Sequence, residues 1–265
     1  MAFLKDITLG QYYPGNSYLH RLDPRSKLLT SLILMTGLLV SHNWTLILLE
    51  IGVCLLAVGF SKVPIGVFMR NLKWFVWLFS ITFAIHALDV HVKGTLPYFG
   101  VALSEAGLRA GLLYTVRLVL LIVFAALLTL TTVPVALTDG LERLLAPLKR
   151  FKLPVHEFAF MMTLALRFIP ILIQEGERVK NAQLSRGASL EGPLLQRIRN
   201  MVPMLLPLFI SAIRRADDLA IAMAARNYTG GDGRTSYSQL AWGQADYITV
   251  TLSLLMLSAV LLLSV

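Results

Sequence analysis

The sequence is poor in charge, in cysteine and in the short motifs of soluble enzymes. Charged residues make up 15% of its 265 residues, against roughly 25% in soluble domains, while 56% are hydrophobic. The single cysteine, Cys54, excludes an internal disulfide and lies in an apolar run, where we expect it to pack as a small hydrophobe. These deficits place the chain among membrane proteins.

The sequence also lacks the residue patterns that usually carry covalent chemistry. The glycine-rich stretch 230–236 has no P-loop lysine, and neither a G-x-S-x-G nor an H-E-x-x-H pattern occurs. The five histidines are scattered singly, so no set of nucleophile, acid and base can be assembled from them. We therefore expect no catalysis by this chain, no cofactor or metal within it and, despite a net charge of +9, no nucleic-acid partner.

Long apolar runs are abundant instead. Residues 66–88, 110–131 and 240–265 each suffice for a membrane-spanning helix, which needs about 20 predominantly apolar residues. Residues 28–40 and 44–60 are shorter and are separated by Ser-His-Asn. They form either a hairpin of two tilted spans, which we favour, or one span with a re-entrant piece. The sequence thus predicts an all-α polytopic membrane protein with about five transmembrane helices.

The region between the fourth and fifth apolar runs has a different character. Residues 132–239 carry 14 of the 24 Lys and Arg residues, yet helical spacing continues over 154–186 and 193–227. These two stretches contain more apolar surface than one hairpin can bury, which predicts an interface with membrane or a partner. The chain accordingly divides into a membrane region 1–131, a charged helical domain 132–239 and a C-terminal transmembrane helix, 240–265.

The basic residues are distributed unevenly between the two sides that five spans create. With the N-terminus in the cytoplasm, 21 of the 24 Lys and Arg residues lie on the cytoplasmic side, and only Lys93 and Arg109 lie outside. Cytoplasmic loops of membrane proteins carry such an excess. This pattern predicts a cytoplasmic N-terminus, a cytoplasmic region 132–239 and a C-terminus outside the cell.

Two charged residues fall inside the predicted spans. Glu50 and Arg117 each lie six or seven residues from the outer end of a span, roughly 10 Å deep at about 1.5 Å per residue. Charged groups at such depth usually pair or line a pathway. Glu50 and Arg117 are therefore a candidate intramembrane pair, the alternative being that each reaches the membrane surface separately.

Both long helical patterns end in a lone arginine that is followed by Gly or Asn. The triplets are Ser185-Arg186-Gly187 and Ala225-Arg226-Asn227. Gly and Asn often end helices in the left-handed conformation, and an arginine favours the negative helix end, so both triplets are compatible with plain helix ends. A guanidinium at the tip of a stiff helix also suits an acidic pocket on a partner, because it can bind carboxylates bidentately.

Several stretches resemble the transmembrane T component of energy-coupling factor (ECF) transporters. They are HRLDPRSKLL (20–29), TTVPVALTDGLERLLAPLKR (131–150), LPVHEFAFMMTLALRFIP (153–170), AQLSRGAS (182–189) and RRADDLAIAMAARNY (214–228). The resemblance implies a prokaryotic cell-membrane protein that joins two cytoplasmic ABC-type ATPases to a membrane S component, which binds a vitamin or another micronutrient. ATP and Mg are then expected in the ATPases.

The resemblance also implies roles for particular residues. It makes 154–186 and 193–227 crossing coupling helices whose arginine tips contact the ATPases, although Ser185 and Asn227 depart from the family's Ala-Arg-Gly motif. The S component is expected on a methionine-rich apolar face of the second helix. That face comprises Met201, Met204, Leu205, Leu208 and Phe209. The alternatives are a self-sufficient permease and an integral-membrane lipid enzyme, but the sequence shows neither repeated halves nor a linked polar motif.

Overall fold

A computed structural model of the chain describes residues 12–41, 43–87, 105–151, 154–188, 193–228, 230 and 240–264. Within these ranges every regular element is helical, which confirms the all-α prediction. Lys93, which the charge pattern places in an outer loop, lies outside the described residues. The helices are α1 (Tyr18–Arg21), α2 (Pro24–Val40), α3 (Trp44–Ser61), α4 (Ile65–Lys73), α5 (Val76–Ala87), α6 (Glu105–Thr131), α7 (Pro134–Leu145), the 3-10 helix η1 (Ala146–Phe151), α8 (Val155–Ser185), α9 (Leu194–Ala225) and α10 (Gln244–Ser264).

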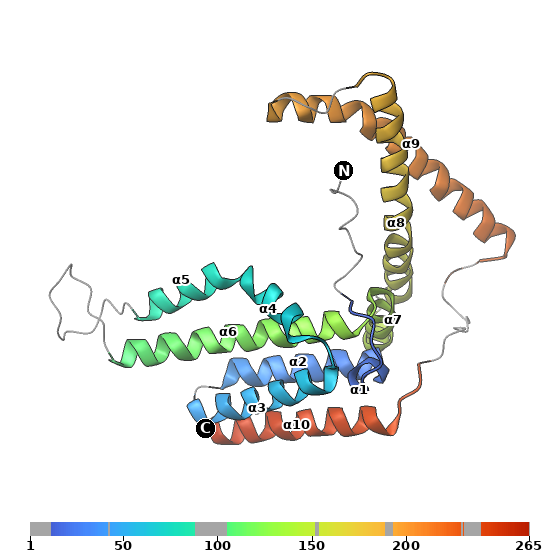
Figure 1. Cartoon of the computed structure of the whole chain (residues 1–265). Helices are drawn as coiled ribbons and strands as arrows, with labels where there is room; N and C mark the ends of the chain where they lie inside the picture. Colours follow the sequence, from blue (N-terminus) through green and yellow to red (C-terminus); the bar gives the residue numbers. More distant parts are fainter. Residues whose placement is uncertain are drawn as a thin grey trace. The chain divides into compact units, whose positions relative to one another are not determined.

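The chain forms two compact units. The bundle unit comprises residues 10–141 and 240–265, and the long-helix unit includes residues 142–239. Within the bundle unit, α6 contacts α2, α3, α4 and α5, while α10 packs along α2 (Figure 1). Leu38, Ile47 and Leu130 are fully buried between these helices, and Cys54 is buried among them as expected.

Among the described residues, four helices are long and apolar enough to cross a membrane. They are α3, α6 from Gly107 to Thr131, α8, and α10 from Gln244 to Leu263. Large apolar side chains on the bundle unit point away from its core, and Leu48, Leu55 and Leu255 are more than half exposed. Such a surface is suited to hydrocarbon rather than to water. Residues 28–60 fall into two separate helices, α2 and α3, of which α3 is among these candidate spans.

The third predicted span, residues 66–88, requires a correction, because it is two helices rather than one. The chain breaks at Trp74 and Phe75, between α4 and α5. Helix α4 is amphipathic, with exposed Arg70 and buried Phe68, and this pattern suits a membrane surface. Helix α5 is apolar on all sides, which suits the membrane interior. The break therefore falls where the composition of the run changes.

A buried polar cluster joins the start of α2 to the start of α10. Asp246 Oδ1 accepts hydrogen bonds from the Asp23 backbone N–H at 2.8 Å and from the Ser26 hydroxyl at 2.5 Å. Asp246 Oδ2 accepts a third bond from the Gly243 N–H at 2.9 Å. One carboxylate thus satisfies three donors that come from two ends of the sequence.

Neighbouring residues extend this cluster in two directions. Asp23 caps α2 through the Arg25 backbone N–H and pairs with the Arg25 guanidinium, which donates to the Leu240 carbonyl. Lys27 Nζ donates to the Thr131 carbonyl at the end of α6, at 3.0 Å. We refer to Asp23, Arg25, Ser26, Lys27 and Asp246 as the polar clamp. It explains the stretch HRLDPRSKLL as a structural element that holds α2, α6 and α10 together.

Candidate coupling surfaces on the long helices

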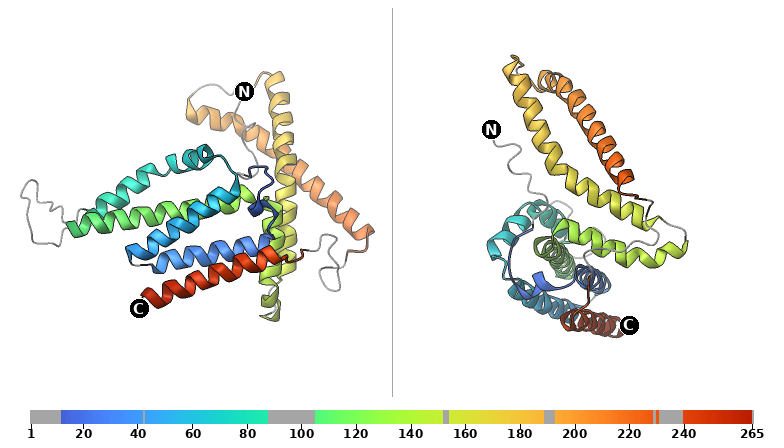
Figure 2. Two further views of the ribbon diagram at one scale, coloured as in Figure 1. Left: turned by 60° about the horizontal axis from the view of Figure 1, so that its bottom comes forward. Right: turned by 90° about the vertical axis from the view of Figure 1, so that its right-hand side faces the viewer.

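The long-helix unit is built around two helices, α8 with 31 residues and α9 with 32. They contact each other and cross, as Figures 1 and 2 show. Arg215 of α9 donates to Glu175 of α8 at 3.2 Å, and Phe160 near the start of α8 stacks on Tyr228 just beyond α9. This pairing makes the two helices antiparallel. At about 1.5 Å per residue each runs for roughly 45 Å along its axis, and α9, which contains Pro203 and Pro207, is bent (Figure 1).

Helix α8 ends in a Schellman motif that is built on its arginine triplet. Gly187 adopts φ +85°, and its N–H donates to the Leu184 carbonyl at 3.0 Å. The Ala188 N–H donates to the Gln183 carbonyl at 3.0 Å, which closes the motif. Arg186 is the last residue before the left-handed turn, so its side chain leaves the helix at the tip.

Helix α9 ends in the same way, although asparagine replaces glycine. Asn227 adopts φ +57°, and its N–H donates to the Ala224 carbonyl at 3.0 Å. The Tyr228 N–H donates to the Met223 carbonyl at 3.0 Å. Asparagine is among the few non-glycine residues that tolerate this conformation, so the departure from the family motif leaves the helix end intact.

The side chains of the two arginines are exposed and have no partner. The guanidinium groups of Arg186 and Arg226 form no hydrogen bond or ion pair with any residue that the structure describes. Because the helices are antiparallel, the two tips lie at opposite ends of the crossed pair (Figure 1). The plain helix-end geometry is thus present at both sites, and at each it leaves a guanidinium free to bind something else.

The apolar face predicted on α9 is largely solvent-accessible in the isolated chain. Leu205 is 61% and Phe209 64% exposed, and Met201 is exposed as well. Met204 and Leu208 are only half-buried. The structure therefore brings all five residues onto one helix without covering them.

Sequence reasoning missed part of this surface. Val202, Leu206 and Ile210 on α9 are exposed as well. Their spacing of four residues was a signal that could have identified them. We refer to Leu205, Leu206 and Phe209 as the exposed apolar face.

Helix α8 changes in character along its length. Its first half is apolar enough for the helix to qualify as a candidate span, yet its second half is rich in charge. The charged residues there are Glu175, Glu177, Arg178 and Lys180. Charges of this density are costly in hydrocarbon, so the half that ends in Arg186 belongs in water.

The structure does not bring Glu50 and Arg117 together. The Arg117 guanidinium donates to the Ser41 carbonyl at the end of α2 and lies over the Tyr114 ring, 5.2 Å from its centroid. Glu50 is fully buried, and neither of its carboxyl oxygens has a hydrogen-bond partner among the described residues. It packs instead against Gly37, where an added Cβ would meet Oε1 at 3.1 Å. The free carbonyls at the C-terminus of α2 offer the arginine an alternative acceptor.

A double-mutant cycle tests this separation. Glu50→Gln and Arg117→Met are expected to change thermal stability additively, within about 0.5 kcal/mol, because the two side chains share no partner. The measurement is thermal unfolding of the purified chain and its variants in one detergent. A coupling energy well above that limit would show that the two residues pair in the membrane.

Comparison with known proteins covers both units. Residues 15–237 match the family model described as cobalt transport protein, CbiQ. The chain is 44% identical over 261 residues to the energy-coupling factor transporter transmembrane protein EcfT of Acidaminococcus fermentans, covering 97% of each chain. It is 42% identical over 264 residues to the protein of the same name from Bacillus subtilis, covering 97% of this chain and 98% of that relative. A third relative of that name, from Heliobacterium modesticaldum, is 45% identical over 253 residues and is covered to 95%.

Proposed function

Because the chain belongs to the family of energy-coupling factor transporter transmembrane proteins, we propose that it links two cytoplasmic ATPases to a substrate-binding membrane S component. The observation that supports this role is the pair of equivalent helix tips. Arg186 and Arg226 end their helices in the same Schellman geometry, and both guanidinium groups are exposed and without a partner among the described residues. Two similar helix tips on one pair of crossing helices are suited to binding two similar partner subunits, one at each tip.

The proposed mechanism uses α8 and α9 as levers. ATP binding and hydrolysis in the partner ATPases move those subunits. The ends of α8 and α9, which are bound to them, move with them. The Glu175–Arg215 contact and the Phe160–Tyr228 stack join the two helices, so a displacement at one tip is transmitted to the other helix. The exposed apolar face then acts on the S component, which selects the micronutrient. This chain supplies contacts and motion, whereas ATP and Mg bind the ATPases.

The proposed orientation of the chain in the membrane is based on the distribution of its charged residues. The basic, charged long-helix unit lies in the cytoplasm together with the N-terminus, and α2, α3, α5, α6 and α10 cross the prokaryotic cell membrane. An odd number of crossings leaves the C-terminus outside. The excess of Lys and Arg in residues 132–239 supports this orientation.

Co-purification and uptake test the proposed function together. The tagged full-length chain is expected to retain two ATPase subunits and an S component when extracted from its own membranes. Uptake of the substrate should require ATP and all of these subunits. Uptake by this chain in the absence of ATPases would instead establish the alternative, a self-sufficient permease.

A substitution on the exposed apolar face tests the contact with the S component. Leu205→Asp places a carboxylate in an apolar contact, where an unpaired charge is costly, so retention of the S component should fall at least about tenfold. The ATPases should stay bound, because the helix tips are unchanged. Quantitative pull-down of both partners is the measurement.

Leu195→Asp is the matched control for this experiment. Leu195 is 82% exposed on the first turn of α9, outside the exposed apolar face. It should leave the S component bound. Equal retention in the Leu205 and Leu195 variants, with normal uptake, would exclude the assigned face.

A further inference from the structure

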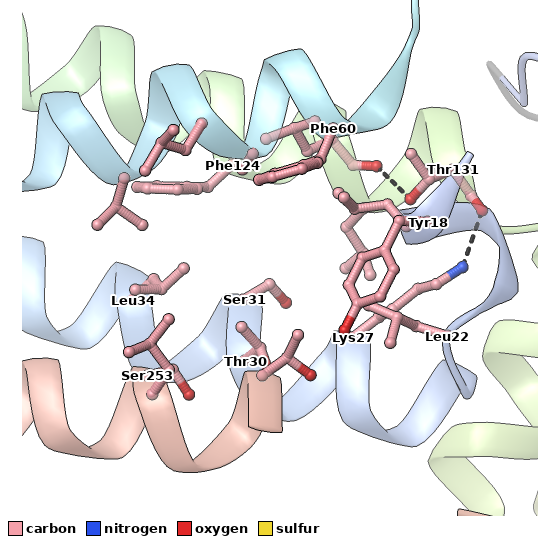
Figure 3. A pocket seen from close by; sticks show the side chains of 18 of the residues that line it. Tyr18, Leu22, Lys27, Thr30, Ser31, Leu34, Phe60, Phe124, Thr131 and Ser253 are labelled. Atoms are coloured by element: carbon pink, nitrogen blue, oxygen red, sulfur yellow. Dashed lines mark hydrogen bonds between the residues drawn. The ribbon is translucent and has the colours of Figure 1, made fainter. Parts of the chain in front are cut away.

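A cavity of about 490 Å³ lies in the bundle unit, lined by residues of α1, α2, α3, α6 and α10. Ligand sites in proteins commonly enclose about 300–1,000 Å³. Figure 3 shows hydrocarbon side chains along its walls, including Leu34, Phe60 and Phe124, with Tyr18 and Lys27 at one end. The cavity is formed entirely within the bundle unit and involves neither helix tip.

The walls offer little to a polar ligand. Four lining hydroxyls donate to carbonyls of their own helices, and Tyr18 donates to the Ala245 carbonyl, which leaves Thr30 as the unpaired hydroxyl among the described lining residues. The four are Ser31, Thr131, Thr249 and Ser253. The ammonium of Lys27 is held by the Thr131 and His20 carbonyls. An apolar chain therefore matches this lining better than a polar solute does.

The residues at the mouth of the cavity show where an occupant enters. Leu56 and Phe60 of α3 and Ile248 and Leu252 of α10 line the cavity, yet each is at least 60% exposed. They face outward from two helices that meet the requirements for membrane spans. The mouth thus opens sideways between α3 and α10, where the neighbouring medium is lipid.

Two cations follow closely after residues that line one end of the cavity. The Tyr18 ring lies 6.3 Å from the Phe60 ring, α1 contacts α3, and Arg21 and Lys62 come three and two residues after Tyr18 and Phe60. Both residues are exposed, and the side chain of neither has a hydrogen bond or ion pair with a described residue. Two free cations beside the end of an apolar slot complement the headgroup of an anionic lipid.

We propose that this cavity binds one acyl chain of an anionic phospholipid, with the phosphate held by Arg21 and Lys62. The bound chain fills the gap between α3 and α10 and restores dispersion contacts that an empty cavity would lack. Lipid binding here does not depend on the ATPase contacts. A failure of this proposal would therefore leave the proposed coupling function unaffected.

Native mass spectrometry of the purified full-length chain tests the acyl-chain site. The wild-type chain is expected to retain phosphatidylglycerol in preference to phosphatidylcholine. Ala57→Trp fills the cavity from α3, and excluding even two chain methylenes should lower lipid occupancy about tenfold. Ala125→Trp on α6 is the matched control, because Ala125 is exposed and does not line the cavity. Equal occupancy in the two variants would overturn the site, as would retention of detergent alone.

Charge substitutions test the headgroup contact. Arg21→Gln with Lys62→Gln should reduce the preference for phosphatidylglycerol about 25-fold, since each cation near a membrane surface contributes about fivefold. The control, Arg70→Gln with Lys73→Gln, removes the same charge from exposed positions on α4. An equal loss of preference in both double variants would mean that the effect is general surface charge rather than a site.

A measurement on the unmodified chain covers the case in which Ala57→Trp fails to fold. Phosphatidylglycerol with a photoreactive acyl chain is expected to cross-link at cavity residues such as Leu252 and Met256. Cross-links spread evenly over other exposed apolar residues, such as Leu48 and Ile81, would overturn the proposal.

Discussion

Replacing Arg186 and Arg226 together with alanine is expected to remove both ATPases from the purified complex and to abolish ATP-driven uptake. Each guanidinium ends a long helix, so it is placed to bind an acidic pocket in one ATPase. Truncating one partner of a desolvated charge pair costs about 2–5 kcal/mol, which weakens each contact by more than tenfold. Pull-down of both ATPases and uptake in the same cells are the measurements, and each single substitution should impair uptake.

Matched variants separate the guanidinium from the helix end. Arg199→Ala removes another exposed arginine of α9 and should leave assembly and uptake unchanged. Arg226→Lys should still weaken ATPase binding and uptake, because the lysine ammonium lacks the planar, bidentate donor geometry of a guanidinium. Asn227→Gly keeps the left-handed turn at φ +57° and should preserve assembly. Full assembly and uptake in the double alanine variant would show that the arginines are plain helix ends.

The ends of the long helices could be predicted because local chemistry determines them. Prolines precede both helices, and Gly187 and Asn227 end them in the left-handed conformation. Helical periodicity also identified an apolar face on α9, since residues three and four apart share one side of a helix. These features depend on neighbours in sequence, and the structure shows them close to where they were expected.

Features that depend on rotation or on distant partners were not predictable in this way. Depth matching placed Glu50 and Arg117 at the same level, but counting residues from the end of a span cannot resolve one helical turn. Glu50 faces Gly37, whereas Arg117 reaches Ser41, four residues farther along α2. Likewise a window of apolar residues cannot distinguish one long span from an amphipathic helix followed by a uniformly apolar one, as α4 and α5 show.

The polar clamp is the clearest example of a feature hidden from the sequence. Asp246 binds the backbone of Asp23 over a separation of 223 residues. Read locally, Asp246 is an acidic residue in the first turn of a transmembrane helix, where the helix dipole already favours it. Its other partners are visible only when α2 and α10 are placed side by side.

Asp246→Ala is expected to destabilise the bundle unit strongly. The substitution leaves the Asp23 N–H and the Gly243 N–H without their acceptor in a site where Asp246 is only 4% exposed, while the Ser26 hydroxyl keeps the Asp23 carbonyl. Each unsatisfied buried donor costs about 1–3 kcal/mol, so the total loss should be on the order of 4 kcal/mol. Thermal unfolding of the purified complex measures the loss, and limited proteolysis should show earlier cleavage around α10.

Two further variants decide whether hydrogen bonding is the cause. Asp246→Asn retains one acceptor oxygen but presents an amide to a remaining donor, so its stability should lie between those of wild type and Asp246→Ala. Glu105→Ala removes an exposed carboxylate, 81% accessible in an ion pair with Arg109, and should cost less than about 1 kcal/mol. If Asp246→Ala proves no less stable than Glu105→Ala, the clamp does not hold α10 in place. Equal losses for Asp246→Asn and Asp246→Ala would instead mean that the charge, rather than the number of acceptors, stabilises the clamp.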